Sequence, residues 1–142
     1  MLRSQGMIVS SLLVAITLSA CQSTKSGGSG GLFSRKPPAS ATYIAALQGG
    51  IIGRSGVDIS DSDLQRALEA EYRALEYGQG GQATAWKGDD SGTYGQAVAA
   101  QPYRVGSQDC RQYTQTVVQD GQTKMARGTA CRNGDGSWTP LT

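Results

Sequence analysis

The sequence predicts an α+β domain in which one amphipathic helix is followed by a small antiparallel sheet of four to five strands, stapled by a disulfide. Three observations lead to this prediction. Apolar residues recur at helical spacing after Ser60, short Thr- and Val-rich runs alternate with Gly turns in the later part of the chain, and Asp120-Gly121 divides two long runs of that kind. The chain of 142 residues has 20 Gly and a single Phe, so its hydrophobic core must be modest.

The best-defined element is a β-hairpin within residues 109–132. Asp-Gly favours a two-residue type I′ turn, because both central residues of that turn need a positive φ. With this turn Gln119 lies opposite Gln122, and the same register places Cys110 opposite Cys131 on a non-hydrogen-bonded pair, where the Cα atoms are close enough for a disulfide. The predicted Cys110–Cys131 bond closes a loop of about 22 residues and contributes about 3 kcal/mol of stability in the loop-entropy description.

The helix begins after Ser60, whose side chain can form a capping pair with Asp63, and it ends at Gly78. Its predicted apolar face consists of Leu64, Ala67, Leu68, Tyr72 and Leu75. The expected strands are residues 83–87, 94–100, 112–119, 122–129 and 137–141, and residues 102–107 form a connection or a short edge piece.

The first 20 residues have the pattern of a secretory signal peptide. Arg3 precedes an apolar run over residues 7–18, which is too short to span a bilayer. The end of this run, Leu-Ser-Ala followed by Cys21, resembles the lipobox of bacterial lipoproteins, in which cleavage precedes the Cys and the Cys receives acyl chains such as palmitate. An ordinary signal peptide with an incidental Cys is the alternative. Acylation of Cys21 accounts for the odd number of cysteines, and export supplies the oxidising compartment that a disulfide needs.

Two segments separate the signal from the domain at residues 58–142. Residues 21–40 are rich in Ser, Gly and Pro, which predicts a flexible tether. In lipoproteins an Asp after the acylated Cys favours retention in the inner membrane, and Gln22 here implies the outer membrane. In residues 41–57, small residues recur every four positions at Ala41, Ala45, Gly49 and Gly53 and would form one face of a helix, as in a short glycine zipper. This segment is either a self-association or membrane-surface element, or a loosely ordered Gly-rich connection that packs on the domain.

Composition argues against several classes of function. Lys and Arg number 13 and Asp and Glu number 11, and the basic residues are scattered, so no nucleic acid partner is expected. The chain has no His, which removes the commonest general base and metal ligand, and a Cys nucleophile would lack its activating base. We therefore expect no enzyme activity, no metal and no cofactor.

Two sets of residues could make contacts at the surface. Arg111 and Arg132 lie two residues off register on one face of the hairpin, where they either shape a cationic spot for a carboxylate or phosphate or belong to a solvated face. The aromatic residues form either a binding platform for a glycan or peptide, or the core of the small sheet; they are Trp86, Tyr94, Tyr103, Tyr113 and Trp138.

The order of these features resembles the bacterial outer-membrane surface-antigen lipoproteins typified by the rickettsial 17-kDa surface antigen. The resemblance rests on the signal ending at Cys21, the Gly-rich run 49–55, the helix with its Ala-Leu-Glu ending, the paired Cys-Arg motifs, and Asp-Gly-Ser-Trp at 135–138. Members of that family often carry a longer glycine zipper, and only one short run is present here. The resemblance implies a lipoprotein of the outer membrane and no catalytic activity.

Three hypotheses for function follow from these observations. The first is a structural or interaction lipoprotein of the cell envelope, anchored in the membrane by lipid on Cys21, with an envelope protein as partner. The second is a lipid-tethered binding module, such as a lysozyme-type inhibitor or a domain that contacts peptidoglycan. The third is an envelope hydrolase, for which the sequence offers no catalytic constellation.

Overall fold

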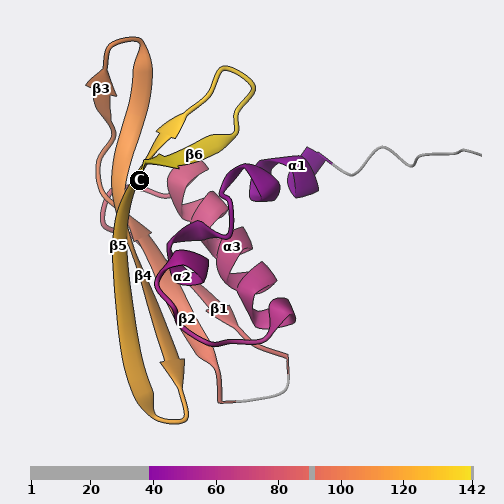
Figure 1. Cartoon of the computed structure of the whole chain (residues 1–142). Helices are drawn as coiled ribbons and strands as arrows, with labels where there is room; N and C mark the ends of the chain where they lie inside the picture. Colours follow the sequence, from indigo (N-terminus) through magenta and orange to yellow (C-terminus); the bar gives the residue numbers. More distant parts are fainter. Residues whose placement is uncertain (1–38, 90–91, 142) are drawn as a thin grey trace, which may run out of the picture. The chain divides into compact units, whose positions relative to one another are not determined.

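The computed structural model describes residues 39–89 and 92–141, and within them three helices precede six strands (Figure 1). The elements are α1 (Ala39–Ala46), α2 (Gly50–Arg54), α3 (Asp61–Glu76), β1 (Ala83–Lys87), β2 (Tyr94–Ala99), β3 (Tyr103–Val105), β4 (Gln108–Gln119), β5 (Gln122–Arg132) and β6 (Trp138–Leu141). The predicted α+β class is confirmed. The predicted signal peptide, the acylated Cys21 and most of the tether lie outside the described residues.

The β4–β5 hairpin follows the predicted register. Both turn residues have positive φ, 51° at Asp120 and 75° at Gly121, as a type I′ turn requires. Gln119 pairs with Gln122, and nine residue pairs further the same ladder ends at Cys110 opposite Cys131, which are joined in a disulfide. The turn chemistry and the covalent bond therefore specify the same alignment of the two longest strands.

The sheet has the order β1-β2-β4-β5-β6, all neighbours antiparallel, and β3 pairs with the outer end of β4. The sixth strand is β3, which falls in the segment expected to be a connection or a short edge piece. It has three residues, all of them exposed, so no alternation of buried and exposed side chains marks it in the sequence.

Helix α3 lies across one face of the sheet, against β1, β2 and β4 (Figure 1). Its first turn is capped as predicted, because the Ser60 hydroxyl accepts a hydrogen bond from the Asp63 backbone N–H at 3.1 Å. At the other end the Gly78 N–H donates to the carbonyl groups of Arg73 and Ala74, which closes the last turn. The buried side of the helix carries Ala67, Leu68, Ala70, Ala74 and Leu75, together with the polar residues Asp63 and Glu71.

The segment before α3 packs on the domain as two short helices, α1 and α2. Three successive residues, Gln48, Gly49 and Gly50, have positive φ and interrupt the helix, so the small residues spaced every four positions do not form one helical face. The expectation of a continuous small-residue face was therefore wrong. Apolar side chains of both helices enter the core instead; they are Ile44, Leu47, Ile51 and Ile52. No helix within residues 39–89 and 92–141 has the length and apolar character needed to cross a bilayer.

Candidate interaction surface

The sheet has one covered face and one open face. Side chains alternate along a strand, so Arg111, Tyr113, Gln115 and Val117 of β4 point towards α3, whereas the even-numbered residues between them point away. The second side of the sheet, which we call the open face, has no helix over it among the described residues (Figure 1).

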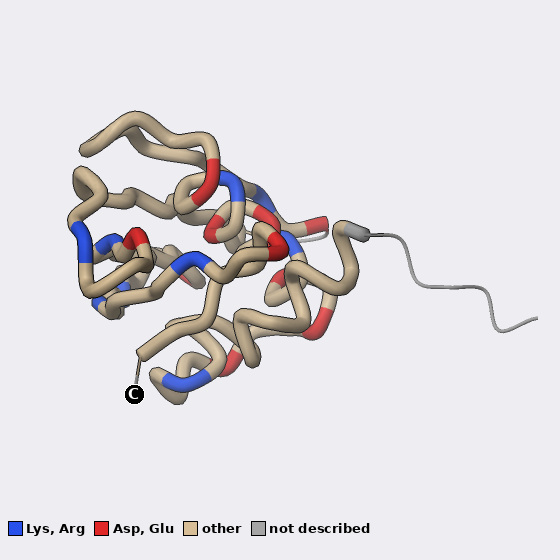
Figure 2. The backbone as a smooth tube through the Cα atoms, turned by 90° about the horizontal axis from the view of Figure 1, so that it is seen from above, with Lys and Arg blue, Asp and Glu red and all other residues tan. Residues whose placement is uncertain are grey.

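Five of the exposed large hydrophobic residues project from the open face, as the strand register places them; they are Tyr94, Tyr103, Val105, Met125 and Leu141. Within the described strands, Lys87 and Arg127 are the only charged residues on this face. Charged residues of both signs are otherwise spread over the described chain (Figure 2). A weakly charged sheet face that no described helix covers is open to contact with a partner.

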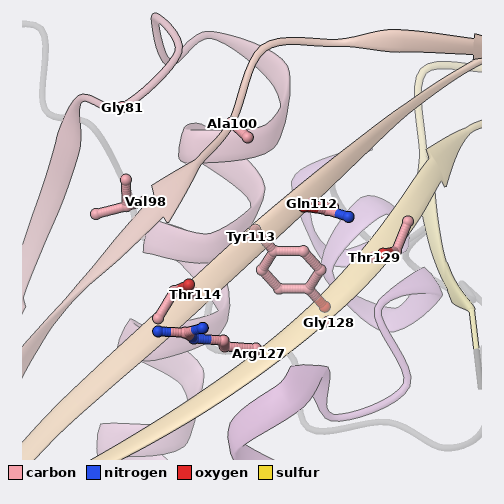
Figure 3. Close-up of a pocket in the computed structure, with 9 residues that line it drawn as sticks. All are labelled: Gly81, Val98, Ala100, Gln112, Tyr113, Thr114, Arg127, Gly128 and Thr129. Atoms are coloured by element: carbon pink, nitrogen blue, oxygen red, sulfur yellow. The ribbon is translucent and has the colours of Figure 1, made fainter.

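A shallow groove of about 490 Å³ runs over the open face, where β2, β4 and β5 meet. Thr114 faces Arg127 across the β4–β5 pair, and Gln112 faces Thr129 in the next row. Figure 3 shows the Arg127 side chain beside Thr114, with Val98 of β2 on the other side. These hydroxyl, amide and guanidinium groups can hold a polar ligand by hydrogen bonds. None of the nine residues that line the groove is His, Cys, Asp or Glu, the side chains most used for acid–base or nucleophilic chemistry.

The aromatic residues that were predicted to form either a binding platform or the core fall into a buried group and an exposed group. Trp86, Tyr113 and Trp138 are buried between the sheet and the helices. Tyr94 and Tyr103 are 50% and 41% exposed and stand at opposite ends of the open face, so they do not make a joint aromatic platform.

Arg111 is buried and holds the end of α3 on the sheet. Its Nη1 donates to the carbonyl oxygens of Leu75 at 2.8 Å and Ala74 at 3.2 Å, and its Nε donates to that of Ala100 at 2.7 Å. Burial lowers the pKa of the guanidinium. A cation at the carbonyl end of a helix is favourable, because the unpaired carbonyl groups carry partial negative charge there.

Arg132 forms a two-pronged ion pair with Glu76, with nitrogen–oxygen distances of 2.7 and 2.8 Å. The Trp138 indole N–H donates to the same carboxylate at 2.8 Å. The Arg132 hydrogen bonds lower the pKa of Glu76, with Trp138 adding to the effect. Both arginines line one hollow of about 160 Å³, so the structure does bring them together. Arg132 and two nitrogens of Arg111 already bind protein oxygens, Arg111 Nη2 is buried without a partner among the described residues, and anion binding by this pair stays a prediction.

A second buried polar cluster, centred on Glu71, was not expected from the sequence. The Glu71 side chain is fully buried, and its Oε2 accepts hydrogen bonds at 3.4 Å from the Ile51 backbone N–H and from Gln115 Nε2. Gln115 also donates to the Ala67 carbonyl and accepts from the Trp86 indole. Burial raises the pKa of Glu71. The signal in the sequence was its spacing, because residue 71 lies on the helical face between Leu68 and Leu75.

Within the described residues, no group of three or more His, Cys, Asp or Glu side chains is placed to hold a metal ion. The two described cysteines, Cys110 and Cys131, are joined to each other. The residues that the structure gathers are therefore suited to packing, hydrogen bonding and surface contact.

Comparison with known proteins identifies relatives of this architecture. A family model described as the 17 kDa outer membrane surface antigen matches residues 73–139, from the end of α3 into β6. The 17 kDa surface antigen of Rickettsia bellii is 35% identical over 157 aligned positions, which cover 92% of this chain and 94% of the relative. The proteins of the same name from Rickettsia conorii and Rickettsia japonica are 40% identical over 81 and 85 positions and cover 56% and 59% of this chain, about half of each relative. No solved structure matches. The resemblance inferred from the motifs is confirmed: the chain belongs to the 17 kDa surface antigen family.

Proposed function

We propose that this protein is a non-catalytic lipoprotein of the bacterial outer membrane, a surface antigen with a structural or interaction role in the cell envelope. The observation that carries the interaction role is the open face, with five exposed large hydrophobic side chains and two charges. The printed names of the family model and of the relatives, which include the words surface antigen and outer membrane, support the location.

The anchor in this proposal is lipid on Cys21. Support comes from the apolar run before this residue and from the Ser/Gly-rich stretch after it. Lipidation adds about 0.8 kcal/mol of membrane affinity for each buried CH₂ group, so several acyl chains on one Cys hold a protein firmly on a bilayer. The absence of His from the sequence and the pairing of Cys110 with Cys131 support the non-catalytic part.

Phase partition with a cloud-point detergent tests the anchor. The wild-type protein should enter the detergent phase and incorporate labelled palmitate, and Cys21→Ala should stay in the aqueous phase without label. Ser23→Ala is the matched control and should behave as the wild type. Detergent partition of Cys21→Ala at the wild-type level would refute lipid anchoring.

Crosslinking in envelope fractions tests the interaction role. Thr114→Glu places a carboxylate next to Arg127 in the groove of the open face, and Gln65→Glu adds the same charge on the exposed side of α3. We expect envelope crosslinks of the anchored protein to disappear in Thr114→Glu and to persist in Gln65→Glu. Equal crosslinking of both variants would exclude the open face as the contact surface.

A second candidate is a lipid-tethered binding module, such as a lysozyme-type inhibitor or a peptidoglycan contact. The specific observation that favours it is the polar lining of the groove, where Gln112, Thr114, Arg127 and Thr129 offer hydrogen bonds of the kind that saccharides use. Two assays at micromolar protein test it, inhibition of lysozyme and co-sedimentation with purified peptidoglycan. No inhibition and no co-sedimentation would exclude it.

A further inference from the structure

One edge of the sheet is free along most of β5. β6 pairs only with Thr129–Arg132, and among the described residues no strand lies beside residues 122–128 on the side away from β4. Because Gln122 closes the two-residue turn, the backbone groups of residues 122, 124, 126 and 128 face β4. The N–H and C=O groups of Thr123, Met125 and Arg127 therefore point outward. We call residues 122–128 the β5 edge; at 3.4 Å per residue it is about 24 Å long.

A hollow of about 330 Å³ lies directly beside this edge. Its lining includes the four consecutive residues Met125–Gly128, whose side chains alternate between the two faces of the sheet. A hollow that touches all four must lie alongside the strand and not over one face. Its other walls are Ile51 and Arg54 of α2 and Leu141 at the end of β6. This is the space that a strand in line with β6 would occupy.

The charge around the hollow is positive. Arg54 and Arg127 are exposed residues of its lining, Lys124 is the exposed residue next to it on β5, and no carboxylate belongs to the lining. A second copy of the chain would bring the same cations to the edge. Residues 22–38 of the same chain carry three basic side chains and no acidic one, so their charge does not complement the positive edge either. Charge complementarity therefore favours a partner with carboxylates.

We propose that the β5 edge binds an extended acidic peptide segment of a partner protein by adding it to the sheet as a further strand. The outward N–H and C=O groups of Thr123, Met125 and Arg127 pair with its backbone. Its carboxylates pair either with Arg127 on the open face or with Lys124 and Arg54 on the covered side, and an apolar side chain fills the hollow against Ile51 and Leu141. The proposal names the partner for the interaction role proposed above and rests on that role, but it does not depend on the lipid anchor.

The test uses the detergent-solubilised full chain and two fluorescent octapeptides with blocked ends, one alternating Val and Glu and the other alternating Val and Lys. We expect the Val/Glu peptide to bind at least tenfold more tightly in fluorescence anisotropy, with affinity falling as salt rises. Hydrogen exchange at the amides of Thr123, Met125 and Arg127 should slow in the complex. Equal affinity for both peptides, or no change in exchange at these amides, would overturn the proposal.

Matched proline variants separate the two sheet edges. Met125→Pro removes an outward N–H from β5, and Ala85→Pro removes an outward N–H from β1, because the even residues of β1 pair with β2. We expect Met125→Pro to abolish peptide binding and Ala85→Pro to keep it. A charge-reversed variant, Lys124→Glu with Arg127→Glu, leaves the backbone untouched and should prefer the Val/Lys peptide. Unchanged preference in that variant would refute the proposal even if Met125→Pro does not fold.

Two further measurements distinguish this inference from its alternatives. Sedimentation that shows a dimer of the wild-type protein, lost in Met125→Pro, would mean that a second copy occupies the edge and would refute the peptide proposal. Envelope crosslinks that persist in Met125→Pro would refute the edge as the partner site and leave the interaction role intact. Loss of those crosslinks together with loss of peptide binding supports the proposal.

Discussion

Replacing Glu71 by Gln should stabilise this protein at neutral pH. The carboxyl group is fully buried under α2, and its Oε1 has no hydrogen-bond partner within the described residues. Burial raises the pKa of Glu71 above its ordinary value near 4.5. The folded state therefore holds a proton that the unfolded state releases as pH rises above that value. The contribution of protonated Glu71 to stability is fully present below pH 4.5 and is lost as pH rises through its folded-state pKa.

The size of the effect follows from the difference between burying a charged carboxylate and burying a neutral amide of the same shape, for which we take about 1–3 kcal/mol, the scale of an unpaired buried polar group. The Gln side chain has the same shape and keeps an oxygen to accept from the Ile51 N–H and Gln115. We expect Glu71→Gln to raise the free energy of unfolding by about 1–3 kcal/mol at pH 7.5. At pH 4 the free energies of unfolding of this variant and the wild type should agree within about 0.5 kcal/mol. For a domain of this size about 1 kcal/mol corresponds to roughly 4–8 °C in Tm.

Glu76→Gln is the matched control, because Glu76 lies on the same helix and its pKa is shifted the opposite way. Its hydrogen bonds from Arg132 lower the pKa, so the contribution of Glu76 is present above pH 4.5 and lost as pH falls through the folded-state value. We expect Glu76→Gln to destabilise by about 1 kcal/mol at pH 7.5, a figure reduced for the partial exposure of Arg132, and to match the wild type in acid.

Thermal unfolding monitored by circular dichroism between pH 2 and 8.5 measures both differences. Subtracting the free energy of unfolding of each variant from that of the wild type at the same pH cancels the titration of groups that all three proteins share. Tyr113 and Arg54 are the other titratable groups near Glu71 and are unchanged in both variants. A Glu71→Gln protein that is less stable than the wild type at pH 7.5 would refute the reasoning, since it would mean that a charged Glu71 has a favourable partner.

Three further substitutions test the supports of the fold. Cys110→Ser should cost about 3 kcal/mol and lower Tm by more than 10 °C, with the same loss on reduction of the wild type, and an unchanged Tm would exclude a stabilising bridge. Gly50→Ala combines a positive φ with a Cβ that would lie 2.6 Å from Glu71 Oε2, and Gly56→Ala has a positive φ in open space. In urea unfolding we expect Gly56→Ala to lower the free energy of unfolding by about 1–2 kcal/mol and Gly50→Ala to lower it by distinctly more. Equal losses in the two variants would contradict close packing at α2. Arg111→Ala removes three hydrogen bonds to backbone carbonyls and should cost about 3 kcal/mol by thermal unfolding, and a loss below about 0.5 kcal/mol would show that these bonds do not hold α3.

The parts of the fold that follow from local chemistry could be predicted from the sequence. Asp120-Gly121 specifies its own turn, and the turn then aligns every pair of β4 with β5, including the two cysteines. Ser60 and Gly78 mark the two ends of α3 for equally local reasons. In these elements, residues a few positions apart decide the structure.

The site residues depend on contacts between distant segments, and the sequence did not reveal their environment. Arg111 is buried because its side chain binds the carbonyl groups of Ala74 and Leu75, 37 and 36 residues earlier in the chain. Glu71 is buried because α2 covers it, and α2 docks there only because Gly50 lacks a side chain. The helix break at Gln48 was missed, since residues 41–54 contain no proline and read as a continuous small-residue pattern.

The two polar clusters contact different halves of α3. The first cluster lies within residues 73–139, the range that the family model matches; it pairs Arg111 with Leu75, and Arg132 with Glu76 and Trp138. Glu71 and its partner Ile51 lie before that range, on the side of the chain that leads to the predicted tether. The second half of α3 is therefore fixed to the sheet by ion pairing and capping that the sheet itself supplies. The first half is held by Gln115 of β4, which donates to the Ala67 carbonyl, and by the contact with α2, in which the Glu71 carboxyl group is buried. Loss of the α2 contact would therefore expose Glu71 and leave the β4–β5 hairpin, with its β5 edge, held by the Cys110–Cys131 bond.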